Sequence, residues 1–203
     1  MSELTPAAKT LLLKEEHREI DDKAHFGFWV YIMTDCILFA SLFAVYAVLH
    51  SNVFGGPSGR QLFSMPYVLT ETTLLLTSSF TCGLALLAAQ YRHRQKVVFW
   101  LGATFLLGAI FLGLEVHEFS HLTATHDSWR RSGFLSAYFT LVGTHGLHIT
   151  IGLLWMAVMI VRLWNTALTD STMRRLKFLS VFWHFLDIVW IFIFTIVYLM
   201  GVA

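Results

Sequence analysis

The chain has 203 residues, of which 56% are hydrophobic, and its 14 basic and 13 acidic side chains give a formal net charge of +1. Soluble domains average roughly 45–50% apolar residues, so this composition favours a membrane protein. The balanced charge argues against a nucleic-acid-binding protein. The two cysteines, Cys36 and Cys82, lie apart in apolar stretches, which argues against a disulfide framework or a cysteine metal motif.

Residues 1–25 are densely charged and do not resemble a cleavable signal peptide, so we interpret them as a cytoplasmic segment. Five windows follow that are long and apolar enough to cross a bilayer as helices. In chain order, we predict spans at 26–49, 66–90, 97–119, 134–161 and 178–200. Apolar runs of this length without alternation exclude the strands of a membrane barrel. The predicted fold is therefore an all-α integral membrane bundle of five transmembrane helices over residues 26–203.

The basic residues predict the orientation of the bundle. Only Arg60, Arg130 and Arg131 fall in the first-to-second and third-to-fourth connections. The other 11 of the 14 basic residues fall in the N-terminal segment and the two remaining connections. Because basic residues concentrate on the cytoplasmic side of membrane proteins, we predict a cytoplasmic N-terminus and a periplasmic C-terminus.

Ionisable residues inside predicted spans are the candidate functional residues, because each costs about 2.5–3.5 kcal/mol at the centre of a bilayer unless it finds a partner. Helical rise sorts them into two layers by depth. The inner layer comprises Asp35, His148, His184 and Asp187. The outer layer comprises Glu71, Glu115, Glu118 and His145.

Three interpretations of these layers remain open. The favoured one is a structural polar network between helices, in which histidines and carboxyl groups satisfy one another. Metal or haem ligation would need histidines on facing helices at matched depth, and His148 with His184 is the candidate pair. A proton relay is the third, because histidine and buried carboxyl groups can exchange protons near neutral pH. The favoured interpretation assigns no catalytic, cofactor-binding or metal-binding residue to this chain.

Three sequence motifs carry a family resemblance. They are FGFWVYIMTDCILFASLFAVYAVL from Phe26, LVGTHGLHITIGLLWM from Leu141 and FWHFLDIVWIFIFTIVYLMG from Phe182. In this order they resemble subunit III of the haem-copper oxidases, and the five-helix length is most similar to the bacterial bo-type (cytochrome o) ubiquinol oxidases. The likeness runs from about Phe26 to the C-terminus.

The resemblance implies a non-redox accessory subunit in the inner membrane of a bacterium. It places no cofactor in this chain, with the haems and copper in subunit I and phospholipid bound to subunit III. Subunit I would be the main partner, beside subunits II and IV, in a complex that oxidises ubiquinol, reduces oxygen to water and pumps protons. The family's histidine and aspartate positions fall on Asp35, His145, His148, His184 and Asp187 as structural residues.

Other functions also fit parts of the sequence. Within the family, the alternatives are subunit III of a cytochrome c oxidase or of a nitric oxide reductase-type complex, because nothing in this chain identifies the electron donor. Outside the family, a stand-alone proton-coupled transporter or a b-type cytochrome would also place ionisable residues inside membrane helices.

Overall fold

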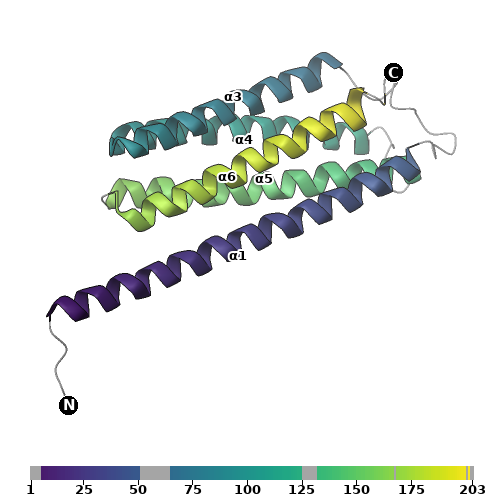
Figure 1. The fold of residues 1–203 in the computed structure, drawn as a ribbon. Helices are drawn as coiled ribbons and strands as arrows, with labels where there is room; N and C mark the ends of the chain where they lie inside the picture. The colour runs from purple at the N-terminus through teal and green to yellow at the C-terminus, as the bar shows by residue number, and fades with distance from the viewer. Residues whose placement is uncertain (1–5, 51–64, 125–131, 167, 200, 202–203) are drawn as a thin grey trace. The chain divides into compact units, whose positions relative to one another are not determined.

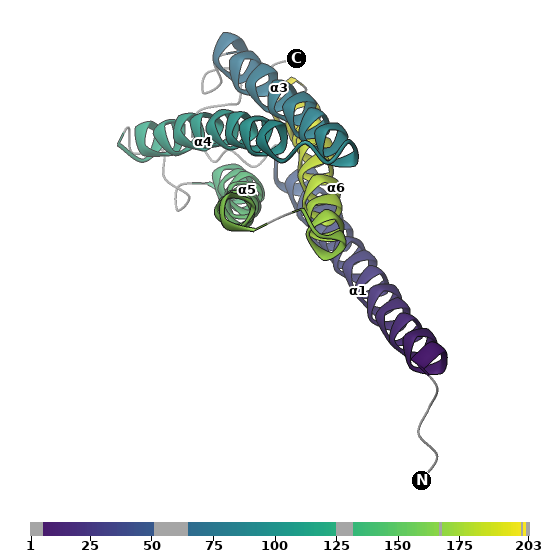
Figure 2. The same cartoon turned by 90° about the vertical axis from the view of Figure 1, so that its left-hand side faces the viewer.

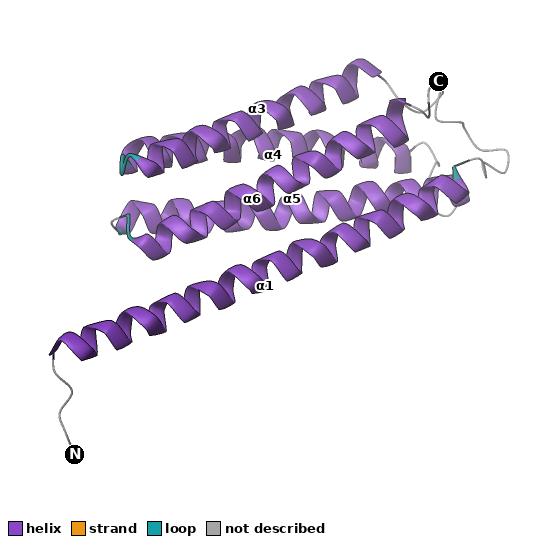
Figure 3. Ribbon diagram, viewed as in Figure 1, coloured by secondary structure: helices purple, strands orange, loops and turns teal. Residues whose placement is uncertain are grey.

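A computed structural model of the chain describes residues 6–50, 65–124, 132–166, 168–199 and 201. Every element in these ranges is helical (Figure 3). The elements are α1 (Pro6–Leu49), α3 (Met65–Gln90), α4 (Arg94–Ala124), α5 (Gly133–Asn165), α6 (Asp170–Ile193) and the π-helix η1 (Phe194–Leu199), as labelled in Figure 1. The all-helical class predicted from the sequence is confirmed for this described part.

Five of these helices are long and apolar enough to cross a membrane, as predicted. Several extend beyond the predicted windows, because an α-helix does not have to end where its apolar stretch ends. The longest extension is in α1, which begins at Pro6 rather than near Phe26. The charged Glu19 and Lys23 there lie one turn apart and form an ion pair, with 3.2 Å between Oε2 and Nζ. Such a pair supports a solvated helix.

The chain divides into two compact units, with the boundary inside α1 between Ala40 and Ser41. The described part of the first unit is the N-terminal portion of α1, and it contains Asp35. The second unit begins at Ser41 and holds all the other helices. The predicted division into residues 1–25 and 26–203 stays a prediction.

In the second unit, α3, α4, α5 and α6 form a closed ring (Figure 2). Helices α3 and α5 each pack against both α4 and α6. The last turns of α1 join this unit through Tyr46, whose ring lies 6.0 Å from that of Phe134 and whose hydroxyl donates to the Val197 carbonyl at 3.5 Å.

The two short connections of the ring meet at one end of the bundle, which we call the Arg94 end. Arg92 lies in the turn between α3 and α4, with a left-handed φ of 57°. Its guanidinium reaches the other connection, where it donates to the Leu168 carbonyl at 2.7 Å and to Asp170 Oδ1 at 2.5 Å. The opposite end, where α3 begins and α4 ends, is the Glu71 end.

Trp183 of α6 fills the centre of the ring. It is fully buried, and its indole Nε1 donates to Ser78 Oγ of α3 at 3.1 Å. Two glycines on the other helices make room for its ring. A methyl group would come within 2.8 Å of the ring at Gly108 of α4 and within 3.1 Å at Gly152 of α5. The Trp183 side chain thus contacts the three other helices of the ring and sets their spacing.

Candidate functional site

Three carboxyl groups from two helices gather at the Glu71 end of the ring. Glu71 lies on α3 and is 0% exposed, and Glu115 lies on α4 and is 3% exposed. Glu118 follows Glu115 on the same face of α4 and is half-buried. All three are close enough to act on one another electrostatically. We call Glu71, Glu115 and Glu118 the carboxyl cluster.

A glycine on α5 lets the cluster approach that helix. The Glu115 carboxyl group lies against Gly146, where an added methyl group would come within 3.3 Å of Oε2. His145 precedes this glycine and stacks on Trp190, with ring centres 5.3 Å apart and an angle of 28°. The Phe111 ring meets His145 edge-on at 6.2 Å. The cluster therefore lies at the meeting point of α3, α4 and α5.

The hydroxyl groups of three tyrosines lie near the cluster, but two of their hydrogen bonds are made to groups outside it. Tyr67 donates to the Leu114 carbonyl at 2.8 Å, which ties the start of α3 to α4. The hydroxyls of Tyr138 and Tyr198 bond to each other at 2.9 Å. Tyr198 also interacts with Glu118. It belongs to η1, whose wider turn is of the kind often found at functional sites.

The cluster is not neutralised by any basic side chain among residues that the structure describes. Both carboxyl oxygens of Glu71 and Glu115, and Oε2 of Glu118, are buried without a hydrogen-bond partner in this set. Arg130, Arg131 and Arg60, counted above for orientation, fall outside the described residues. Buried polar groups in native proteins are almost always satisfied, so this exception needs a physical explanation.

A second polar group lies midway along α6, on the side facing α3. Ser79 Oγ and His184 Nδ1 are 2.7 Å apart, and His184 Nδ1 is 3.6 Å from Asp187 Oδ2. The Asp187 side chain is 7% exposed, whereas that of His184 is 41% exposed. We call Ser79, His184 and Asp187 the histidine group. Its imidazole lines a shallow apolar groove of about 520 Å³ on α3, beside Gly83 and Phe80.

The structure brings together three residues of the predicted outer layer and two of the predicted inner layer. The three glutamates of the predicted outer layer come together, with His145 nearby on α5. In the predicted inner layer, His184 pairs with Asp187, while His148 Nδ1 bonds to the Thr144 carbonyl of its own helix at 2.7 Å. Asp35 belongs to the other unit of the chain. That these residues form a structural network stays a prediction.

Sequence reasoning missed Ser79. Most hydroxyls of α3 bond to carbonyls of their own helix, as Thr72, Thr73 and Thr77 do at 2.7–2.8 Å. Among the described residues of α3, Ser79 is the one whose hydroxyl bonds to an imidazole, that of His184. Its sequence context does not differ from that of its neighbours, so only the helix packing identifies it.

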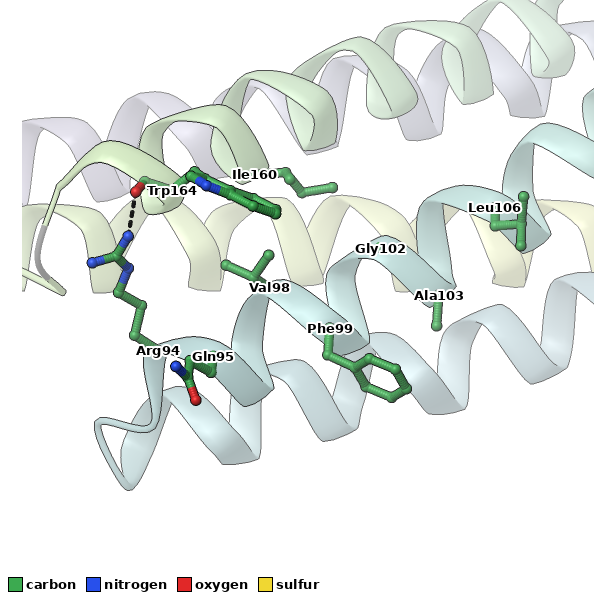
Figure 4. Close-up of a pocket in the computed structure, with 9 residues that line it drawn as sticks. All are labelled: Arg94, Gln95, Val98, Phe99, Gly102, Ala103, Leu106, Ile160 and Trp164. Carbon is green, nitrogen blue, oxygen red and sulfur yellow. Dashed lines mark hydrogen bonds between the residues drawn. The ribbon is translucent and has the colours of Figure 1, made fainter.

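A larger groove follows α4 from the Arg94 end. It has a volume of about 1020 Å³ and runs between α4 and the end of α5 (Figure 4). Arg94 and Trp164 lie at one end, with Phe99, Gly102 and Leu106 further along. The Arg94 guanidinium donates from Nε to the Leu163 carbonyl at 2.5 Å and from Nη2 to the Trp164 carbonyl. We call this the Arg94 groove.

Within the described ranges, no three histidine, cysteine, aspartate or glutamate side chains are placed to hold a metal ion. The fold and its polar groups thus define a class: a multi-pass helical membrane protein whose ionisable side chains lie between helices.

Comparisons with known proteins narrow this class. A family model described as cytochrome c oxidase subunit III matches residues 9–202. Subunit 3 of a cytochrome bo(3) ubiquinol oxidase from Pseudomonas aeruginosa strain PAO1 is 57% identical over 87% of this chain and 84% of its own length. The same subunit from Buchnera aphidicola subsp. Baizongia pistaciae is 48% identical over 91% and 95%. Cytochrome c oxidase subunit 3 from Bacillus sp. strain PS3 is 43% identical over 93% and 92%.

The chain belongs to the cytochrome c oxidase subunit III family. The resemblance stated from the three sequence motifs is confirmed.

Proposed function

We propose that this chain is the non-redox accessory subunit III of a proton-pumping ubiquinol oxidase. The observation that carries the proposal is the similarity, over most of the chain, to subunits whose names specify ubiquinol or quinol oxidases. The complex would oxidise ubiquinol and reduce oxygen to water in the bacterial inner membrane, with the N-terminus of this chain cytoplasmic and the C-terminus periplasmic. Haems and copper would lie in subunit I.

The electron donor is tested by purifying the complex through an affinity tag on this chain. We expect haem and copper to copurify, and the complex to oxidise ubiquinol but not reduced cytochrome c. Oxidation of cytochrome c would reassign the chain to the alternative within the family. A haem spectrum that stays with the isolated chain after the other subunits are removed would contradict an accessory, non-redox role.

The histidine group supports a particular face as the contact with subunit I. His184 lies near the middle of α6 and is 41% exposed, so it would face hydrocarbon if nothing covered it. A polar side chain at that depth is costly unless it contacts protein. Its Nδ1 already faces Ser79 and Asp187. A partner helix carrying a polar side chain opposite Nε2 would cover the remaining edge of the ring.

Contact at this face is tested by crosslinking. A Gly83→Cys variant places a thiol in the groove beside His184, at a position where an added side chain meets no atom within 4 Å. We expect a bifunctional thiol reagent to link it to subunit I in the intact complex. Gly113→Cys on α4, which has equally open surroundings, is the matched control. Linkage from Gly113→Cys and none from Gly83→Cys would place the interface elsewhere.

The Arg94 groove is the proposed position of a bound phospholipid. Among the described residues, no carbonyl or carboxylate accepts a hydrogen bond from Nη1 of the Arg94 guanidinium. This nitrogen therefore suits a phosphate group. Trp164 suits the interfacial region of the bilayer. From Arg94 to Leu106 the groove follows α4 for about 18 Å at helical rise, which is enough for much of an acyl chain.

Filling the groove tests this site. Gly102 lines it and has no atom within 4 Å of an added side chain, as is also true of Gly113, which lies outside it on the same helix. We expect Gly102→Leu to reduce the phospholipid retained by the purified complex, measured by mass spectrometry of extracted lipid. Gly113→Leu is expected to leave retention unchanged. Equal lipid content in both variants and the wild type would contradict the site.

A further inference from the structure

The carboxyl cluster raises the question of what neutralises three acidic groups in an apolar bundle. Glu71 is 0% exposed and Glu115 3% exposed, and neither has a hydrogen-bond partner or ion pair among the described side chains. A buried ionised carboxylate is very costly unless it is paired. Three such groups within electrostatic reach of one another add mutual repulsion. The cluster therefore needs a basic side chain, a metal ion or protons.

Among the residues that the structure describes, the surroundings favour protons over the other two. His145, on α5, is held between the Trp190 and Phe111 rings, and the described residues offer no metal-binding group. The neighbouring hydroxyls do not reach the two enclosed groups either. Tyr67 donates to the Leu114 carbonyl, Tyr138 and Tyr198 share one hydrogen bond, and the further interaction of Tyr198 is with Glu118, so Glu71 and Glu115 stay without a hydrogen-bond partner among the described residues. A carboxylate only accepts hydrogen bonds, whereas a protonated carboxyl group can also donate one, so hydrogens on the glutamates would let the groups bond to one another.

The three groups also lie in an order that permits exchange with solvent. Glu118 is half-buried and lies one turn nearer the end of α4 than Glu115 does. Glu115 and Glu71 lie behind it, with Gly146 leaving room for the Glu115 carboxyl group. A proton that enters at Glu118 would therefore reach the two enclosed groups through it.

We propose that Glu71, Glu115 and Glu118 form a buried proton-binding site, in which at least the enclosed Glu71 and Glu115 are protonated at neutral pH and exchange with solvent through Glu118. The site requires only groups of this chain. It does not depend on whether the complex oxidises ubiquinol or cytochrome c.

The protonation state is tested by infrared spectroscopy on the complex purified through this subunit at neutral pH. Protonated carboxyl groups absorb separately from carboxylates, and their band shifts in deuterated water. We expect Glu71→Gln and Glu115→Gln each to remove absorption equivalent to one carboxylic acid. Glu19→Gln, an exposed position on α1, is the matched control and should remove none. Carboxylic acid absorption that is unchanged in both cluster variants would overturn the proposal.

Accumulation of the variants is a second measurement. Glutamine is a neutral group of nearly the same shape, so both variants should accumulate at the wild-type level if the native groups are neutral. Failure of both to assemble would mean that charge is needed there, and this too would overturn the proposal.

Glu118→Gln tests whether protons enter the cluster through Glu118. We expect slower deuterium exchange of the remaining cluster band, and an unchanged exchange rate would contradict entry through Glu118.

Discussion

The carboxyl cluster at the Glu71 end of the bundle is enclosed by three helices, whereas the histidine group midway along α6 reaches the outer face of the ring. Glu71 and Glu115 find no hydrogen-bond partner among the described residues. In the histidine group, His184 Nδ1 is 2.7 Å from Ser79 Oγ, while Asp187 Oδ2 lies 3.6 Å from the same nitrogen and neither Asp187 oxygen has a hydrogen-bond partner in the described set. Both groups face the same problem, because polar atoms in an apolar environment must be satisfied. Their solutions differ with their burial.

The difference shows what each group requires from its surroundings. An enclosed cluster must be neutralised inside the bundle, here by protons that enter through Glu118. A group on the outer face can instead be completed by another polypeptide. The histidine group should therefore respond to loss of the partner subunits, and the carboxyl cluster should respond to changes within α3, α4 and α5.

The largest effect should come from removing the core that both groups share. Trp183→Ala deletes a fully buried indole that contacts three other helices. We expect a loss of about 3–5 kcal/mol in the free energy of unfolding, as for other buried aromatic side chains. The measurement is thermal unfolding of the purified complex. Trp29→Ala, at a 56% exposed position on α1, should change it little. Similar losses in the two variants would mean that Trp183 does not hold the ring together.

The next effect concerns the histidine group. His184→Ala should leave the buried Asp187 without its neighbour, at a cost of about 1–3 kcal/mol. We expect less of this chain to stay with subunit I during purification. Thr77→Ala, on the α3 helix, removes a hydroxyl that bonds only to its own backbone and serves as the control. Normal assembly with quinol oxidation abolished at full haem content would instead indicate a direct mechanistic role.

The smallest expected effect tests whether Glu115 of the carboxyl cluster packs against α5. Alanine in place of a helical glycine normally stabilises by about 0.5–1 kcal/mol. At Gly143 the added methyl group would meet Phe119 at an ordinary 3.6 Å, so this gain should appear. At Gly146 it would meet the Glu115 carboxyl group at 3.3 Å, so the gain should be cancelled or reversed. Thermal unfolding of the two variants compares them directly, and equal stabilisation would show that Glu115 does not press on α5.

Much of the fold could be predicted because span length and apolarity are local properties of the sequence. The five helices follow from windows of about 20 apolar residues. The π-helical turn at Phe194–Leu199 could not be predicted, because its six residues carry no local signal that separates them from an ordinary α-helix. The continuation of α1 back to Pro6 lies outside the predicted membrane span, since charged residues end a membrane span but not a helix.

The candidate site could be predicted only as far as depth along each helix allows. Helical rise placed Glu71, Glu115 and Glu118 at one level, and the structure brings them together. Depth does not give rotation about the helix axis. His148 shares a predicted layer with His184, yet its Nδ1 bonds to its own helix. Ser79 could not be separated from the other hydroxyls of α3 for the same reason.

Trp183 and its two glycines impose a rule on related sequences. The indole ring occupies space that a side chain at position 108 or 152 would need. Residues that share a contact are coupled energetically, so their substitutions should not act independently. A relative that carries alanine in place of Gly108 is expected to carry a smaller ring at the position of Trp183. The double variant Gly108→Ala with Trp183→Phe should accordingly be more stable than Gly108→Ala alone, which makes these positions a compensating pair across α4 and α6.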